Sequence, residues 1–220
     1  MQFHAVLFDL DGTLLDTLED LADSTNAALV AEGFAAHPLS AYRYFIGDGV
    51  ESLVRRALPP ERLDEVTVAS SVESMRREYS ARWADKTRPF PGVAELLDAL
   101  AARGLPMAVL SNKPDDFTRL CVSRLLPRWR FEVVLGGDVG LPKKPDPAGA
   151  RQIAVRLKLA PAQILYLGDT NTDMQTAVAA GMYPVGALWG FRTASELTAS
   201  GAQVLLEKPT DMLGVLDDVA

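Results

Sequence analysis

Short apolar runs alternate with amphipathic segments along most of the chain. Four runs, at residues 5–8, 107–110, 131–135 and 164–167, are mainly apolar and lack the alternation of a half-exposed strand. Such runs are typical of strands that are buried on both faces of a parallel sheet. Similar runs at residues 183–187 and 203–206 predict two further strands.

The segments between these runs repeat apolar residues at helical spacing. They predict helices at residues 93–103, 117–126, 148–157 and 173–180. Gly104 and Gly181 follow the first and the last of these segments, where glycine favours the end of a helix. Strands that alternate with helices predict βαβ units, and therefore an α/β fold with a parallel sheet and helices on both faces.

Residues 17–86 interrupt this alternation. They contain no convincing strand run, whereas apolar residues between positions 18 and 29 recur at helical spacing. The sequence Arg88-Pro89-Phe90-Pro91-Gly92 then marks a stiff return to the α/β pattern. We therefore predict a core domain of residues 1–16 and 87–220 with an all-helical insert at residues 17–86.

The composition indicates a globular protein without an obvious macromolecular partner. With 220 residues, 48% of them hydrophobic, the chain can bury a substantial core. Its formal net charge of -7 gives no overall attraction to nucleic acid or to anionic membranes. Cys121 is the only cysteine, so no intramolecular disulfide can form. Because the N-terminus lacks a secretion signal and no segment approaches the ~20 apolar residues of a membrane span, we expect a cytoplasmic protein.

Polar residues follow three of the predicted strands. The first strand leads into Asp9-Leu10-Asp11-Gly12-Thr13, and the second leads into Ser111 and Asn112. The run that ends at residue 167 leads into Asp169, with Asp173 one helical turn later. Because ligand sites in open parallel sheets form beyond the carboxyl ends of the strands, we expect these side chains to converge.

Several crowded carboxylates favour a bound cation. They repel one another, and Mg²⁺ prefers carboxylate, carbonyl and water oxygens. Taken singly, Asp169 could cap the following helix, and Ser111 or Asn112 could serve a turn. These structural roles do not explain why all the polar residues fall at strand ends, so we predict a magnesium site.

Four short motifs occur in order along the chain. They are Asp9-Leu10-Asp11-Gly12-Thr13, Ser111, Lys144 before Pro145, and Gly168-Asp169-Thr170-Asn171-Thr172-Asp173. Together they resemble the motifs of the haloacid dehalogenase-like hydrolases over nearly the whole chain. The resemblance implies an α/β fold, with a Rossmann-like parallel sheet core and an inserted all-helical cap domain. It also implies a magnesium-dependent phosphoric monoester hydrolase.

The resemblance assigns roles to the residues of these motifs. Asp9 is the nucleophile that forms an aspartyl-phosphate, and Asp11 is the general acid and base. Mg²⁺ would be held by Asp9, the Asp11 carbonyl and Asp169. Asp173 would support these ligands without binding the ion itself. The predicted phosphate-binding residues are Gly12, Thr13, Ser111, Asn112 and Lys144. Spacing alone does not separate Lys144 from Lys143, and we choose Lys144 because the family's lysine commonly precedes a proline.

The helical insert resembles the family's cap, which excludes water and governs substrate choice. Gly47 and Gly49 lie in a stretch similar to the Gly-x-Gly substrate loop of phosphoglycolate phosphatases, although a plain turn before a helix is the alternative. Residues 138–147 and 189–193 resemble the same relatives. Arg55 or Arg56 could grip a substrate carboxylate with two parallel hydrogen bonds, although a position facing water is the alternative for either.

The resemblance thus implies a small-molecule phosphoester, 2-phosphoglycolate, as the substrate. Trp189 and Phe191 stand where those relatives carry a tyrosine-containing loop, which leaves a phosphosugar, a nucleotide or pyrophosphate as alternatives. Phosphonoacetaldehyde hydrolases need a cap lysine, and the related phosphoglucomutases use a cap histidine and a cap lysine. The insert has only Lys86, at its edge, and only His37, in a predicted surface loop, so neither activity is well supported. A phosphate-binding regulator without catalysis is a further alternative, but it would be expected to have lost Asp9 or Asp11, and both are present. The sequence leaves open whether the chain is a monomer or a homodimer.

Overall fold

The computed structural model describes residues 3–217. Within these residues it contains two compact units: a core unit of residues 3–15 and 89–217, and a helical unit of Asp16–Arg88. No helix among the described residues is long and apolar enough to cross a membrane.

The core unit contains a six-stranded parallel sheet in the order β5-β4-β1-β6-β7-β8. The strands are β1 (Ala5–Phe8), β4 (Met107–Pro114), β5 (Val133–Gly137), β6 (Ile164–Gly168), β7 (Tyr183–Ala187) and β8 (Val204–Leu206). Each predicted apolar run lies wholly or largely in one of them. β4 is longer than its apolar run predicts, because it continues through Ser111 and Asn112 to Pro114 across an irregularity in its pairing with β5.

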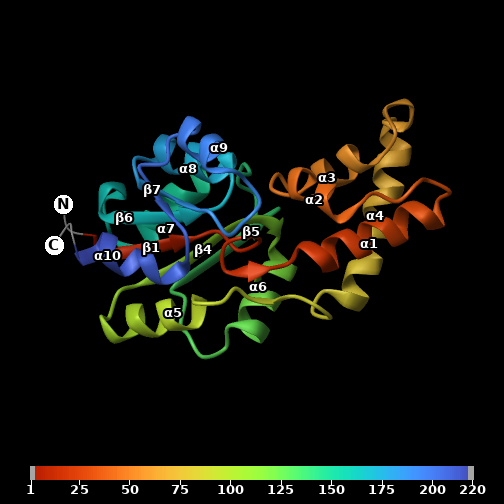
Figure 1. The fold of residues 1–220 in the computed structure, drawn as a ribbon. Coiled ribbons are helices and arrows are strands. Elements are labelled where there is room, and N and C mark those ends of the chain that lie inside the picture. Colours follow the sequence, from red (N-terminus) through yellow and green to blue (C-terminus); the bar gives the residue numbers. More distant parts are fainter. Residues whose placement is uncertain (1–2, 218–220) are drawn as a thin grey trace. The chain divides into compact units, whose positions relative to one another are not determined.

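Helices cover both faces of this sheet (Figure 1). They are α5 (Val93–Ala102), α6 (Asp115–Leu125), α7 (Ala148–Leu157), α8 (Asn171–Ala180), α9 (Ala194–Ala199) and α10 (Met212–Asp217), with short 3₁₀ turns η2 (Pro161–Gln163) and η3 (Pro209–Asp211). Apolar residues of α7 and α8, such as Ile153 and Ala177, pack against Leu7 and Tyr166 on one face. The right-handed crossovers place α5 and α6 on the other face. The predicted α/β class with a parallel sheet is therefore confirmed.

The sheet register places the first aspartate at the centre of the carboxyl edge. Phe8, the last residue of β1, pairs with Val109 of β4 on one side and with Leu167 of β6 on the other. The Asp9 amide then donates a hydrogen bond of 2.9 Å to the Leu167 carbonyl. Asp9 therefore emerges between the two strands that carry the other predicted site residues.

The helical unit consists of α1 (Leu18–Ala31), α2 (Leu39–Phe45), α3 (Val50–Ala57), η1 (Pro60–Arg62) and α4 (Glu65–Arg82). Residues 17–87 are all described, and they contain no strand. The short strands β2 (Leu15–Asp16) and β3 (Arg88–Pro89), where the chain enters and leaves this unit, pair with each other. An inserted all-helical segment is therefore present, as the sequence predicts.

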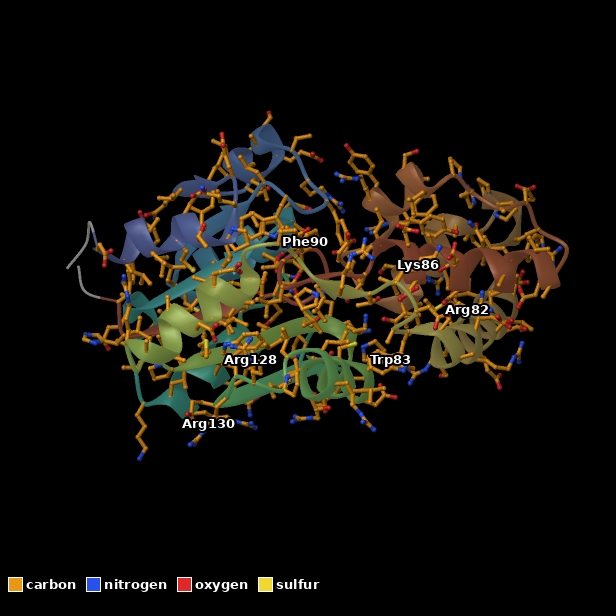
Figure 2. All side chains as sticks on the ribbon, turned by 60° about the horizontal axis from the view of Figure 1, so that its bottom comes forward. Arg82, Trp83, Lys86, Phe90, Arg128 and Arg130 are labelled. Carbon is orange, nitrogen blue, oxygen red and sulfur yellow. The ribbon has the colours of Figure 1, made fainter. Side chains whose placement is uncertain are left out.

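A buried carboxylate ties the two ends of the helical unit together. Asp20, on the first turn of α1, is 1% exposed. It accepts hydrogen bonds from the Lys86 amide and from both the amide and the hydroxyl of Thr87, at 2.7–3.1 Å. Lys86, on the segment that returns to Phe90 (Figure 2), also pairs with Glu19 and Asp23 through its ammonium group.

Candidate active site

A buried lysine joins two of the predicted aspartates. Lys144 Nζ lies 2.7 Å from Asp9 Oδ1 and 2.7 Å from Asp173 Oδ1, and it also donates to the Leu110 carbonyl. The side chains of all three charged residues are at most 8% exposed. Lys143 instead pairs with Asp138 at 3.1 Å and is one-third exposed. The structure therefore brings Lys144, and not Lys143, to the predicted nucleophile.

Asn112 fixes the backbone of this lysine. Its side-chain oxygen accepts a hydrogen bond of 2.8 Å from the Lys144 amide, and its side-chain nitrogen donates to the Lys144 carbonyl at 3.0 Å. The neighbouring Ser111 hydroxyl accepts from the Lys113 amide at 3.2 Å. Both predicted phosphate-binding residues are therefore buried beside Asp9, and the Asn112 side chain also supports the loop that carries Lys144.

Asp169 is held by groups from two other segments. Its Oδ1 accepts a hydrogen bond of 2.9 Å from the Thr13 hydroxyl, and its Oδ2 accepts one of 2.8 Å from the Phe191 amide. The Thr13 hydroxyl, predicted to contact phosphate, is thus bonded to a carboxylate in this structure. Trp189 Nε1 donates to the Thr13 carbonyl at 2.9 Å, which joins the same two segments.

Two glycines make room for the Asp169 carboxylate. Gly12 has a φ of 88°, and a Cβ at this position would lie 2.3 Å from Asp169 Oδ2. A Cβ at Gly190 would lie 2.2 Å from Asp169 Cβ. Gly12 thus adopts a backbone conformation that favours glycine, directly beside Asp169. Gly190 was missed, because nothing in the sequence shows that the loop after β7 contacts Asp169.

Both oxygens of Asp173 are fully engaged by protein groups. Oδ1 accepts from Lys144 and from the Tyr166 hydroxyl, at 2.7 and 3.1 Å. Oδ2 accepts from the amide and the hydroxyl of Thr170, at 3.0 and 2.6 Å, and so caps the start of α8. Tyr166 was missed because it lies inside an apolar strand, where the sequence indicates only core.

Burial dominates the electrostatics of this cluster. It raises the pKa of Asp9 well above its ordinary value, and the Asp173 charge adds to this effect whereas Lys144 opposes it. Burial, followed by the Asp173 charge, raises the pKa of Asp169 from 3.8 to about 7. Burial alone would lower the pKa of Lys144, but Asp173 and Asp9 outweigh it and raise the pKa. The cluster therefore sets three buried carboxyl groups, Asp9, Asp169 and Asp173, against the single ammonium group of Lys144.

The carboxylates fit a divalent cation. Oxygens of Asp9, Asp169 and Asp173 lie within 4.8 Å of one another. Asp9 Oδ1 forms an ion pair with Lys144 but has no aligned hydrogen-bond donor, although it is fully buried. Each Asp169 oxygen accepts one of the hydrogen bonds described above, whereas the Asp173 oxygens accept two each. Asp9 and Asp169 therefore have acceptor capacity for a metal, and Asp173 does not.

A second ion pair lies beside this cluster. Lys113 Nζ lies 2.8 Å from Asp11 Oδ1, and the two side chains are 4% and 13% exposed. The sequence predicted Asp11 but missed Lys113, because the second strand was expected to end at residue 110, with only Ser111 and Asn112 at its carboxyl end. A lysine directly after Ser111 and Asn112 was the available signal.

The predicted substrate residues of the helical unit are two glycines in a loop and an ion-paired arginine. Gly47 and Gly49 have positive φ angles, 133° and 89°, and Gly49 precedes α3. Arg55 pairs with Glu51 at 2.9 Å and with Glu65 at 2.7 Å. Arg56 donates to the Phe45 carbonyl at 3.0 Å and pairs with Asp48 in the glycine loop.

His37 lies in a loop, as predicted, and is partly exposed. The ring Nε2 lies 2.7 Å from the Ala57 carbonyl, and the ring packs edge-on against Phe45. His37 therefore has a structural environment within the helical unit.

The family of haloacid dehalogenase-like hydrolases matches residues 6–187, which include the aspartate cluster, Lys113 and Lys144. The chain belongs to this family. Within the haloacid dehalogenase-like hydrolases, it falls in the subgroup similar to phosphoglycolate phosphatases. It is 36% identical to "Phosphoglycolate phosphatase" of Xylella fastidiosa (strain 9a5c), over 94% of this chain and 90% of that protein.

Other haloacid dehalogenase-like hydrolases support the same placement. The chain is 33% identical to "Phosphoglycolate phosphatase" of Escherichia coli O157:H7, over 97% of this chain and 92% of that protein. The crystal structure of a predicted phosphoglycolate phosphatase from Haemophilus somnus 129pt superposes with a TM-score of 0.88 at 29% identity, covering 98% of each chain. The chain therefore shares both sequence and fold with these relatives over almost its full length.

Proposed function

We propose that this chain is a phosphatase that hydrolyses a small phosphomonoester through an aspartyl-phosphate on Asp9. The observation that carries this proposal is the buried cluster at the carboxyl edge of the sheet. It combines one carboxylate with spare acceptor capacity, a cationic lysine 2.7 Å away, and a second aspartate two residues along the chain. These are the groups that a covalent phosphoryl transfer needs.

A magnesium ion fits the carboxylates of this site. Asp9, Asp169 and the Asp11 carbonyl would hold it, while Asp173 remains with Lys144. The ion, when bound, supplies positive charge that offsets the repulsion between a carboxylate nucleophile and a phosphate dianion. The spacing of these side chains supports this assignment, because oxygens of Asp9, Asp169 and Asp173 lie within 4.8 Å of one another.

The chemistry then proceeds in two balanced steps. An Asp9 oxygen attacks phosphorus while the bond from phosphorus to the leaving oxygen breaks, and Asp11 gives its proton to that oxygen. Asp11, now a carboxylate, takes a proton from water as the water oxygen bonds to phosphorus and the bond to Asp9 breaks. Phosphate is released, and Asp11 is protonated again.

The remaining site residues position the phosphoryl group. Lys144 supplies positive charge beside the nucleophile. Ser111 and the Asn112 amide would contribute from β4, just beyond the residues that pair with β1. Gly12 brings backbone close to the phosphoryl position, and Thr13 acts through its hydrogen bond to Asp169 as well as by any direct contact.

We propose 2-phosphoglycolate as the substrate, because the relatives that match over most of the chain carry the name phosphoglycolate phosphatase. The helical unit would act as the cap that selects it, through the loop of Gly47 and Gly49 and through Arg55. A phosphosugar, a nucleotide or pyrophosphate is the alternative. We further propose a cytoplasmic enzyme, monomeric or homodimeric, with no nucleic-acid or membrane partner, in line with its net charge of -7.

The proposal is tested by phosphate release from a panel of these phosphoesters in Mg²⁺ and in EDTA. We expect Mg²⁺-dependent release with a preference for 2-phosphoglycolate. Asp9→Asn should abolish turnover and the acid-stable protein-bound phosphate that appears during turnover. Asp85→Asn, at an exposed position of the helical unit, is the matched control. Turnover by Asp9→Asn at the parent rate would refute the covalent mechanism, and no release from any ester would favour a phosphate-binding regulator.

A further inference from the structure

The ion pair between Lys113 and Asp11 lies outside the roles derived above. Lys113 Nζ is 2.8 Å from Asp11 Oδ1, and its side chain is 4% exposed. It does not belong to the Lys144 pairs, because those pairs involve Asp9 and Asp173. The core unit thus places one buried lysine on the proposed nucleophile and a different one on the proposed acid and base.

The backbone around Lys113 is fixed. Its amide donates to the Ser111 hydroxyl at 3.2 Å, and its carbonyl accepts from the Thr118 hydroxyl at 3.0 Å. Thr118 lies on α6, which begins directly after β4, and is fully buried. Because both neighbours belong to regular elements of the core, the backbone from which the Lys113 side chain reaches Asp11 is held on both sides.

Stability alone does not account for such a pair. Removing two charges from water is costly, and a buried ion pair is often no more stabilising than apolar side chains of similar volume. Asp11 keeps 13% of its side-chain surface exposed, so it could be hydrated without the lysine. A nearly buried cation that faces this carboxylate is therefore better explained by what Asp11 does.

We propose that Lys113 is a positioning residue for Asp11, an inference that rests on the proposed function. When Asp11 gives its proton to the leaving oxygen, negative charge appears on its carboxylate next to the Lys113 ammonium group. The ammonium group stabilises that charge and holds Oδ1, so that Oδ2 carries the proton in both steps. The carboxylate is thereby kept in the orientation needed to take the proton back from the attacking water. Lys113 itself exchanges no proton.

Kinetics of four variants test this role. They are Lys113→Met, Asp11→Asn, the double variant, and Lys143→Met as a control at the partly exposed lysine that pairs with Asp138. The measurement is kcat and KM for phosphate release in saturating Mg²⁺, with 2-phosphoglycolate or the panel ester that the parent hydrolyses fastest. Lys113→Gln, which keeps a polar side chain, replaces Lys113→Met if circular dichroism shows that the latter is unfolded.

The expected pattern is non-additive. General acid–base catalysis contributes roughly 10²- to 10⁴-fold, so Asp11→Asn should lower kcat by about that factor, and Lys113→Met by roughly 10- to 100-fold. KM should not rise in Lys113→Met. The double variant should match Asp11→Asn within about threefold, because Lys113 acts only through Asp11.

Three outcomes would overturn the inference while leaving the proposed function intact. In the first, Lys113→Met has the same kcat as Lys143→Met. In the second, Lys113→Met lowers kcat in the Asp11→Asn background by the same factor as it does in the parent protein. In the third, Lys113→Met raises KM, which is the effect expected from removing a cation that anchors the substrate. Failure of the proposed function is distinguishable, because Asp11→Asn would then keep the parent kcat whatever the effect of Lys113→Met.

Discussion

The Phe191 amide donates a hydrogen bond of 2.8 Å to Asp169 Oδ2, which joins the loop after β7 to the end of β6. The residue before it, Gly190, lies so close that a Cβ there would be 2.2 Å from Asp169 Cβ. The position of a proposed metal ligand thus depends on a backbone segment that is distant in sequence and bears no charge at the point of contact.

Gly190→Ala should therefore displace Asp169. We expect a loss of roughly 1–3 kcal/mol in the free energy of unfolding from overpacking, and a loss of about 10- to 100-fold in Mg²⁺ affinity, as for other residues that orient a metal ligand. Urea unfolding and Mg²⁺ titration of phosphate release measure the two effects. Gly214→Ala, in α10 with open space around the new Cβ, is the control. It should leave Mg²⁺ affinity unchanged and should not lower the free energy of unfolding, because alanine favours a helix more than glycine does. Unchanged Mg²⁺ affinity in Gly190→Ala would contradict this account.

Stabilisation by Mg²⁺ should depend on pH. The pKa of Asp169 is about 7 in the folded protein, which is above its value in the unfolded chain. The contribution of this group to the stability of the fold is therefore fully present below about pH 4 and is lost as the pH rises through about 7. A bound cation needs the ionised carboxylate and must displace the proton at lower pH. We therefore expect Mg²⁺ to raise Tm more at pH 8 than at pH 5.5.

Thermal unfolding with and without Mg²⁺ at these two pH values provides the measurement. Asp169→Asn should abolish the Mg²⁺-dependent rise in Tm, whereas Asp85→Asn should retain it. An equal rise at both pH values in the parent protein would show that Asp169 does not bind the ion or does not titrate in this range.

The two adjacent lysines should differ sharply in their effect on stability. Lys144→Met leaves the buried carboxylates of Asp9 and Asp173 without their cation, which should lower the free energy of unfolding by about 3–5 kcal/mol. Lys143→Met removes a partly exposed pair and should change it by less than about 0.5 kcal/mol. Urea unfolding in EDTA at pH 8 compares them. Similar stabilities of the two variants would contradict the buried network.

Arg55 offers a test of substrate choice. If it grips a substrate carboxylate, Arg55→Met should raise KM for 2-phosphoglycolate by roughly 10- to 100-fold, the range expected for hydrogen bonds between charged groups. KM for ethyl phosphate, which lacks the carboxylate, should stay the same. Because the pairs of Arg55 with Glu51 and Glu65 are partly exposed, the substitution should change the stability of the fold little. Equal changes in KM for both esters would exclude a contact with the carboxylate.

The sequence by itself determined the α/β class, because runs such as residues 5–8 and 164–167 are apolar on both faces and only a helix-covered parallel sheet buries both. It also placed Asp9, Asp169 and Asp173 at one edge of that sheet, since the carboxyl ends of parallel strands meet there. The four motifs indicated the family, which the comparisons confirm. The roles assigned to the individual site residues, and the extent of the predicted domains, stay predictions.

Only the tertiary structure decided which groups meet around these aspartates. The choice of Lys144 over Lys143 depends on the path of the loop after β5, and neighbouring lysines look alike in sequence. Lys113, Tyr166 and Gly190 were invisible because each contributes through contacts with distant segments: an ion pair, a hydroxyl inside an apolar strand, and the absence of a side chain. Local patterns record burial and spacing along the chain, whereas these contacts arise from the packing of strand ends against loops that follow other strands.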